Sequence, residues 1–206
     1  MMRLPNVIRK EVSATQLLWK YTPADSYVLN LGSGNIRISE NSVGIDIQER
    51  KEVDVIGDAH KLPFASGTFD ACVAVAVFQH FKNPFTVVSE IRRVLKDGGV
   101  AVVDAPFVQQ YCRDTPDLFR YTKLGLENMF SDGFEVLETH VSIAAGSALA
   151  FYGQGLAGYV SGNRLLRGAA VFGTSVLLYP LRYLRFGRHH EVAGAHMLVA
   201  RKKRVN

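Results

Sequence analysis

Three stretches among the first 60 residues combine glycine and carboxylate side chains at a spacing that suits a nucleoside-binding site. The first apolar run breaks at Gly32 and Gly34, and glycine permits both a sharp turn and the close approach of a ligand. A second run leads to Asp46, whose carboxylate could accept hydrogen bonds from the two hydroxyls of a ribose. A third leads to Asp58 and Ala59, which could accept from the amine of an adenine and donate a backbone N–H to a ring nitrogen. The sequence therefore predicts a crevice for an adenosine-containing ligand.

A parallel sheet would place these residues at one edge. Apolar segments rich in β-branched residues and bounded by Gly, Asp or Pro predict strands at 27–31, 43–47, 53–56, 69–77 and 99–104. Between the last two strands, Asn83 and Pro84 open an amphipathic helix over 84–96, and two glycines follow it. This alternation predicts a mostly parallel sheet that binds its ligand beyond the carboxyl ends of the strands.

The 206 residues are expected to form a single domain with an elaborated C-terminal end. Its expected parts are an N-terminal helix within 1–22, a binding core with a lid over 23–142, a helical insert over 144–186 and a final strand within 194–202. In more detail, we expect an amphipathic helix from Val7 to Trp19, a helix at 122–131, a strand at 134–143 and two apolar helices at 146–161 and 168–184.

Composition and charge restrict the class of protein. With 48% hydrophobic and 21% charged residues, the chain is globular. Two cysteines and an N-terminus without a continuous apolar segment favour a reducing, cytoplasmic location. Residues 1–142 hold 15 Lys and Arg against 18 Asp and Glu, whereas residues 143–206 hold nine basic residues and one acid. The C-terminal third is therefore expected to face an anionic partner, such as phospholipid head groups, a pyrophosphate carrier or nucleic acid, unless it is simply a solvated basic surface.

The glycine and acid motifs together resemble a known family. In order and spacing, VLNLGSG (28–34), VGIDI (43–47), GDAHKLPF (57–64) and RVLKDGG (93–99) are similar to the class I S-adenosylmethionine-dependent methyltransferases. The likeness is greatest to the ubiquinone and menaquinone biosynthesis group, which carries the methyltransferase type 11 domain. It covers about residues 27–104 and implies a Rossmann-like α/β fold: a seven-stranded, mostly parallel sheet with one antiparallel strand and helices on both faces.

The same resemblance implies a set of cofactor-binding residues for S-adenosylmethionine. Gly32 and Gly34 would pass beside the methionine portion, Asp46 and the neighbouring Ile47 would hold the ribose, and Asp58 with Ala59 would hold the adenine. Asn30 would contribute from the position where the family usually has Asp. Asparagine can accept a hydrogen bond but brings no charge to the cationic cofactor.

Catalysis and acceptor binding are expected from residues beyond the fourth and fifth strands. His80 is the candidate general base and Asp104 a weaker one, and each could instead be structural. The segment 107–121 is expected to lie over the site as a lid, and its end resembles a PxDxxRYT-like stretch of some methyltransferases. Its candidate acceptor-binding residues are Tyr111, Arg113, Arg120 and Tyr121; an internal Arg–Asp network that fixes the loop is equally open.

The apolar insert leaves the partner and even the function class open. Residues 141–163 carry no charged side chain, but glycines dilute the apolar character, so we expect a helical cap rather than two membrane spans. The flanking arginines suit an anionic bilayer, which predicts an apolar or lipid-linked small-molecule acceptor and a peripheral place on the inner face of the membrane. The resemblance of residues 114–122 to methyltransferases of glycan and small-molecule pathways implies a glycan-linked acceptor as the other choice. We expect no nucleic-acid partner and no metal site. The alternative is a non-catalytic membrane or interaction module that keeps the methyltransferase scaffold.

Overall fold

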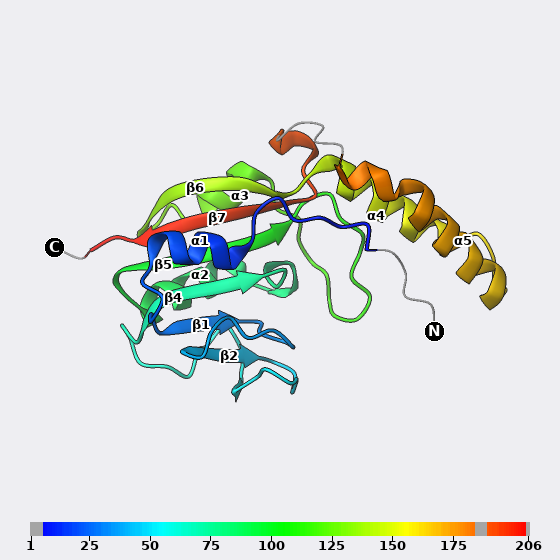
Figure 1. The fold of residues 1–206 in the computed structure, drawn as a ribbon. Coiled ribbons are helices and arrows are strands. Elements are labelled where there is room, and N and C mark those ends of the chain that lie inside the picture. The colour runs from blue at the N-terminus through cyan, green and yellow to red at the C-terminus, as the bar shows by residue number, and fades with distance from the viewer. Residues whose placement is uncertain (1–5, 184–188, 205–206) are drawn as a thin grey trace.

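The computed structural model describes residues 6–183 and 189–204, which form a seven-stranded sheet with helices on both faces (Figure 1). The strand order is β3-β2-β1-β4-β5-β7-β6, and β7 runs antiparallel to both of its neighbours. The predicted mostly parallel sheet with one antiparallel strand is confirmed. The strands are β1 (Val28–Leu31), β2 (Ser42–Asp46), β3 (Val55–Ile56), β4 (Phe69–Val75), β5 (Leu95–Pro106), β6 (Phe134–Ile143) and β7 (Ala195–Lys202).

Helices bury both faces of the sheet. Helix α1 (Ala14–Tyr21) covers one face, and α2 (Pro84–Val94) and α3 (Lys123–Met129) cover the other. Successive side chains of β4 therefore belong to different cores: Ala71 packs with α1, while Cys72 packs with α2. This two-sided burial explains why the strands read as continuous apolar runs rather than as alternating ones.

The N-terminal helix begins later than predicted. The apolar spacing predicts a helix from Val7 to Trp19, but α1 begins at Ala14. Ser13 caps it: its Oγ accepts a hydrogen bond from the Gln16 N–H at 3.2 Å, and Gln16 Oε1 accepts one from the Ser13 N–H at 3.0 Å. This reciprocal pair is a capping box, which fixes the first helical residue.

Residues before the cap pair with the sheet instead. Lys10 forms an isolated antiparallel bridge with Ile143, and the Glu11 N–H donates to the Ser142 carbonyl at 2.8 Å. Because these backbone groups already have partners on β6, the amphipathic pattern of residues 7–13 does not become helix.

The connection between β1 and β2 contains no helix. Residues 32–41 form turns and extended backbone, and Arg37 fixes them by donating to Glu52 at 2.8 Å and to Asp54 at 2.8 Å. Asp54 in turn accepts a hydrogen bond from the Gly44 N–H at 2.7 Å. An ion-pair network thus takes the place of a helix at this short crossover.

The apolar insert is a helical hairpin of α4 (Ala145–Ala157) and α5 (Arg164–Leu178), which projects beyond the end of the sheet (Figure 1). Helix α5 begins earlier than the predicted 168, because Asn163 caps it and draws Arg164 and Arg167 into the helix. Within the described ranges, no helix is both long and apolar enough to span a bilayer. Short 3-10 helices complete the structure at Phe78–His80, Tyr179–Tyr183 and His190–Val192.

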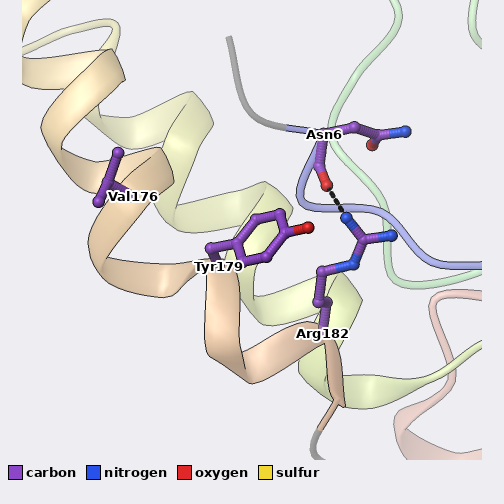
Figure 2. Close-up of a pocket in the computed structure, with 4 residues that line it drawn as sticks. All are labelled: Asn6, Val176, Tyr179 and Arg182. Carbon is purple, nitrogen blue, oxygen red and sulfur yellow. Dashed lines mark hydrogen bonds between the residues drawn. The ribbon is translucent and has the colours of Figure 1, made fainter.

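A hollow of about 500 Å³ lies where the N-terminal segment meets the end of the hairpin. Figure 2 shows the Arg182 guanidinium donating a hydrogen bond to the Asn6 carbonyl, beside Tyr179 and Val176. Arg182 also lies 4.9 Å from the centre of the Tyr179 ring, a cation–π contact. These contacts tie the hairpin to the N-terminal segment.

Candidate active site

A cavity of about 610 Å³ opens at the carboxyl ends of β1, β2 and β4. This is the sheet edge at which the strand and helix pattern predicts a ligand. The residues that line it include most of those singled out from the sequence: Gly32, Gly34, Asp46, Ile47, Asp58, Ala59 and His80. The fold therefore brings together candidate residues from separate strand ends.

The turn after β1 requires glycine at two positions for different reasons. Gly32 has φ +68° and Gly34 has φ +52°, a region that other residues adopt only with strain. A Cβ on Gly32 would lie 2.8 Å from the Val77 Cβ, whereas a Cβ on Gly34 would meet nothing within 4 Å. Because Gly34 lines the cavity, a side chain there would fill ligand space. A ligand can therefore approach the backbone closely at Gly34.

Backbone N–H groups hold the Asp46 carboxylate at the tip of β2. Its Oδ2 accepts a hydrogen bond from the Gly34 N–H at 3.2 Å, and its Oδ1 accepts one from the Gln48 N–H at 3.0 Å. The Gly32 N–H also donates to the Ile45 carbonyl at 2.8 Å, which fixes the turn to β2. Each carboxylate oxygen keeps acceptor capacity, so Asp46 can still bind a pair of hydroxyls.

Asp58 is anchored by its neighbour His60. Its Oδ1 accepts hydrogen bonds from the His60 N–H at 2.9 Å and from the His60 ring Nδ1 at 2.6 Å. These hydrogen bonds, the backbone one foremost, hold the pKa of Asp58 below its ordinary value. His60 Nε2 accepts from the Asn83 N–H at 3.1 Å, which links Asp58 to the start of α2. The carboxylate is thus ionised and fixed in place, with Oδ2 left for a ligand.

Asn30 differs from the sequence-based expectation. It is 5% exposed and is not among the described residues that line the cavity. Its side-chain amide donates a hydrogen bond to the Ile36 carbonyl at 2.7 Å. The structure therefore places Asn30 beneath the glycine turn, bracing the backbone, rather than in the position of a cofactor contact.

His80 lies in the cavity with both ring nitrogens engaged. Nδ1 is 2.6 Å from the Pro116 carbonyl, and Nε2 is 3.0 Å from the Gln79 side-chain amide nitrogen. A carbonyl only accepts and an amide NH₂ only donates, so these partners assign the proton to Nδ1 and the lone pair to Nε2. His80 therefore fastens the 107–121 segment to the end of β4. It could act as a base only if the acceptor replaced the contacts of Nε2 with Gln79 and, at 3.3 Å, with the Thr115 hydroxyl.

The other candidate base, Asp104, is used elsewhere. Its Oδ2 accepts a hydrogen bond from Lys10 Nζ at 2.7 Å, and its Oδ1 accepts one from Ser142 Oγ at 2.6 Å. Asp104 is 3% exposed and is not among the described residues that line the cavity. The ion pair joins the N-terminal segment to β5, and the Ser142 hydrogen bond joins β5 to β6, so Asp104 has a structural role.

The candidate acceptor-binding residues divide into two pairs. Arg120 pairs with both oxygens of Asp117 and donates to the Gln110 carbonyl at 3.0 Å, while the Tyr121 hydroxyl donates to the Phe78 carbonyl at 2.9 Å. The internal Arg–Asp network is therefore the arrangement observed, and the pKa of Asp117 is lowered by Arg120. The expected acceptor contacts of Arg120 and Tyr121 are not supported, because both side chains hold the segment itself.

Tyr111 and Arg113, by contrast, line a second cavity of about 840 Å³ between the 107–121 segment and the helical hairpin. The Arg113 guanidinium lies 4.9 Å from the centre of the Tyr159 ring. Since Thr115 and Pro116 of the same segment line the first cavity, this segment forms a wall of both.

Several lining residues have no role in the sequence-based site. Ala76 and Val77 follow β4, and the rule that ligands bind at strand ends could have identified them. Ala76 has φ +52°, a strained backbone for a residue with a side chain, which only coordinates reveal. Phe81 and His60 also line the cavity, and no pattern in the sequence points to either.

Residues 14–103 match the family model described as a methyltransferase domain. A demethylmenaquinone methyltransferase of Thermotoga maritima is 36% identical over 69 residues, which cover 32% of this chain and 30% of that protein. A tRNA (carboxymethyluridine(34)-5-O)-methyltransferase of Xenopus tropicalis is 32% identical over 98 residues, covering 39% of this chain and 15% of that protein. The match thus spans less than a third of the length of these relatives.

A solved structure extends the likeness to the whole fold. The 1,6-didemethyltoxoflavin-N1-methyltransferase of Burkholderia thailandensis, solved with 1,6-didemethyltoxoflavin and S-adenosylhomocysteine bound, has a TM-score of 0.60 with this chain at 12% sequence identity. The superposition covers 93% of this chain and 77% of that one. At this identity, the likeness is one of architecture.

Proposed function

Because this chain carries a methyltransferase domain and the fold of the class I S-adenosylmethionine-dependent methyltransferases, we propose that it transfers a methyl group from S-adenosylmethionine to a small-molecule acceptor. The observation that carries this proposal is the cavity in which Gly34, Asp46 and Asp58 meet. The glycine turn and the two fixed carboxylates together form a surface that is complementary to an adenosine.

The residues present fit the cofactor. Asp46 would accept from the ribose hydroxyls, with Ile47 beside them, and Asp58 with the Ala59 N–H would hold the adenine. Gly34 leaves open the space that a Cβ would fill, so the methionine portion can pass along the backbone. Asn30 would support cofactor binding indirectly, because its side-chain amide donates to the Ile36 carbonyl and so fixes the glycine turn.

The methyl transfer depends more on the alignment of the acceptor with the methyl group than on acid–base catalysis. Bound S-adenosylmethionine supplies a methyl group on a sulfonium, which is already activated for in-line attack. The protein's part is to close and shape the cavity, and Thr115 and Pro116 provide a wall. We propose that His80 positions this wall through its hydrogen bond with Pro116, and that a base is needed only for acceptors that must lose a proton.

Titration calorimetry with S-adenosylhomocysteine tests the cofactor site. We expect saturable binding to the wild-type chain, weakened at least tenfold in Asp46→Ala and in Asp58→Ala, since each removes charge-assisted hydrogen bonds worth about 1.5–3 kcal/mol. Asp25→Ala is the matched control, because Asp25 is an exposed carboxylate outside the cavity lining.

The same titration separates the enzyme from the alternative of a non-catalytic module. Absence of binding in the wild-type chain would favour the module and overturn the proposal. Binding that survives in both variants would retain a cofactor site but refute its placement at Asp46 and Asp58.

We further propose that the protein is cytoplasmic and acts at the inner surface of a membrane on a glycan- or lipid-linked acceptor. The hairpin exposes large apolar side chains, among them Leu165 at 84% and Leu177 at 76%. Arg164, Arg167 and Arg182 accompany them, and the hairpin sequence 145–178 contains no acid. Apolar insertion combined with basic residues is the usual chemistry of docking on anionic bilayers.

Co-sedimentation with vesicles of phosphatidylcholine, with and without phosphatidylglycerol, tests the docking. We expect binding that requires the anionic lipid, falls with salt and is lost in the double variant Leu165→Glu and Leu166→Glu. Leu124→Glu is the control, because this α3 leucine is 73% exposed on another part of the surface. No binding at low salt would contradict the proposal.

A further inference from the structure

The second cavity has a lining of mixed chemistry. It lies between residues 110–113 and the helical hairpin and has a volume of about 840 Å³. Its cationic side chains are Arg113, Arg164 and Arg167. Its aromatic and aliphatic ones are Tyr111, Tyr152, Leu156, Tyr159 and Val171. No Asp or Glu is among the described residues of the lining.

Specific contacts build this cavity. The Tyr152 hydroxyl donates to the Gln109 carbonyl at 2.8 Å, and the Gln110 side-chain amide donates to the Phe151 carbonyl. Gln110 packs where a Cβ on Gly155 would lie, so glycine at this position of α4 lets the segment dock. The wall that carries Tyr111 and Arg113 is therefore fastened to α4.

The arginines of this cavity are available for a ligand. Across the described ranges, Arg113, Arg164 and Arg167 form no ion pair; Arg113 instead lies over the Tyr159 ring at 4.9 Å. Asp114 is adjacent in sequence but is not part of the lining. Three guanidinium groups around one hollow are suited to the forked hydrogen bonding of a phosphate.

The cavity also borders the cofactor site. Arg113 lines the second cavity and Thr115 lines the first, and two residues of chain span at most about 7 Å. A molecule held against Arg113 would therefore lie on the other side of the segment that walls the cofactor site.

We infer that this cavity binds a phosphorylated amphiphile: its phosphate lies against Arg113, Arg164 and Arg167, and its apolar part lies along Tyr152, Leu156 and Tyr159. The assignment rests on the proposed methyl transfer, for which this molecule is the acceptor. The acceptor would then be a phosphorylated amphiphile, and Arg164 and Arg167 of the hairpin would take part in binding it.

Titration calorimetry on the full chain, saturated with S-adenosylhomocysteine, tests the assignment with three probes. Farnesyl diphosphate offers both chemistries, inorganic pyrophosphate only the anion and farnesol only the apolar chain. We expect farnesyl diphosphate to bind saturably and at least tenfold more tightly than either of the others. The double variant Arg164→Gln and Arg167→Gln should weaken it at least tenfold, whereas Lys203→Gln and Arg204→Gln, which removes the same charge at the end of β7, should not.

Each outcome separates this inference from the proposed function. The amphiphile site is overturned if both double variants lose the same affinity for farnesyl diphosphate, or if farnesyl diphosphate does not bind saturably. Pyrophosphate binding as tightly as farnesyl diphosphate overturns the apolar part of the assignment. S-adenosylhomocysteine affinity is measured in every variant. If S-adenosylhomocysteine binds to none of them, the proposed function fails. If its affinity is unchanged while farnesyl diphosphate does not bind, only the amphiphile site fails.

Discussion

Gly32→Ala should destabilise the protein more than Gly67→Ala, although both residues have nearly the same positive φ. Gly32 has φ +68° and Gly67 has φ +67°. A Cβ on Gly32 would collide with Val77, whereas a Cβ on Gly67 would meet nothing within 4 Å. Comparing the two substitutions therefore separates the cost of a positive φ from the cost of the collision with Val77.

The expected magnitudes follow from these two differences. A left-handed conformation costs an alanine about 1–2 kcal/mol, partly offset by about 0.4–1 kcal/mol because alanine restricts the unfolded chain. Gly67→Ala should thus lower the free energy of unfolding by about 1 kcal/mol. Overpacking against Val77 adds about 1–3 kcal/mol, since a β-branched side chain cannot easily turn aside. Gly32→Ala should lower it by about 2–4 kcal/mol.

Urea unfolding of both variants measures the difference in the free energy of unfolding. Titration with S-adenosylhomocysteine shows whether the altered turn still permits cofactor binding. We expect weaker binding in Gly32→Ala and wild-type binding in Gly67→Ala. Adding Val77→Ala to Gly32→Ala should recover part of the stability. Equal destabilisation by the two glycine substitutions would refute the close packing of the turn against Val77.

Three further substitutions test contacts and backbone strain in and around the site. Asn30→Asp removes the donor to the Ile36 carbonyl and places a buried charge beside it, so it should lower the urea midpoint and weaken cofactor binding; tighter binding would show a direct contact with the cofactor instead. Arg93 hydrogen bonds hold the pKa of Glu90 below its ordinary value of 4.5, so the stability that this ion pair adds is complete above that value and is lost as pH falls through the lower folded pKa. Glu90→Gln should therefore lower the free energy of unfolding by about 1–3 kcal/mol at pH 7 and reduce its decline in acid, and parallel curves of unfolding free energy against pH would count against this ion pair. Ala76→Gly should stabilise the chain by up to about 1 kcal/mol by relieving its φ of +52°, and a lower thermal midpoint would exclude strain there.

The cofactor side of the site follows from the sequence because it depends on strand ends. In a parallel sheet, the residues after β1, β2 and β3 must meet at one edge, so Gly34, Asp46 and Asp58 could be placed together without coordinates. The prediction of seven strands with one antiparallel came from the family resemblance rather than from periodicity, whereas the strand order and the identity of the antiparallel strand came from the structure.

The remaining features depend on contacts between distant residues. His80 meets Pro116 across 36 residues, and Gln110 meets Phe151 across 41, so no local pattern reveals either pairing. The direction of the Asn30 side chain is set by the path of the glycine turn. The start of α1 could have been read from Ser13 and Gln16, a local signal that outweighs apolar periodicity.

A crystal structure with S-adenosylhomocysteine bound would show directly whether the adenosine occupies the first cavity. We expect both ribose hydroxyls within hydrogen-bond distance of the Asp46 carboxylate and the adenine beside Asp58 and Ala59. A ligand seated elsewhere, or an adenosine that contacts neither carboxylate, would contradict this expectation.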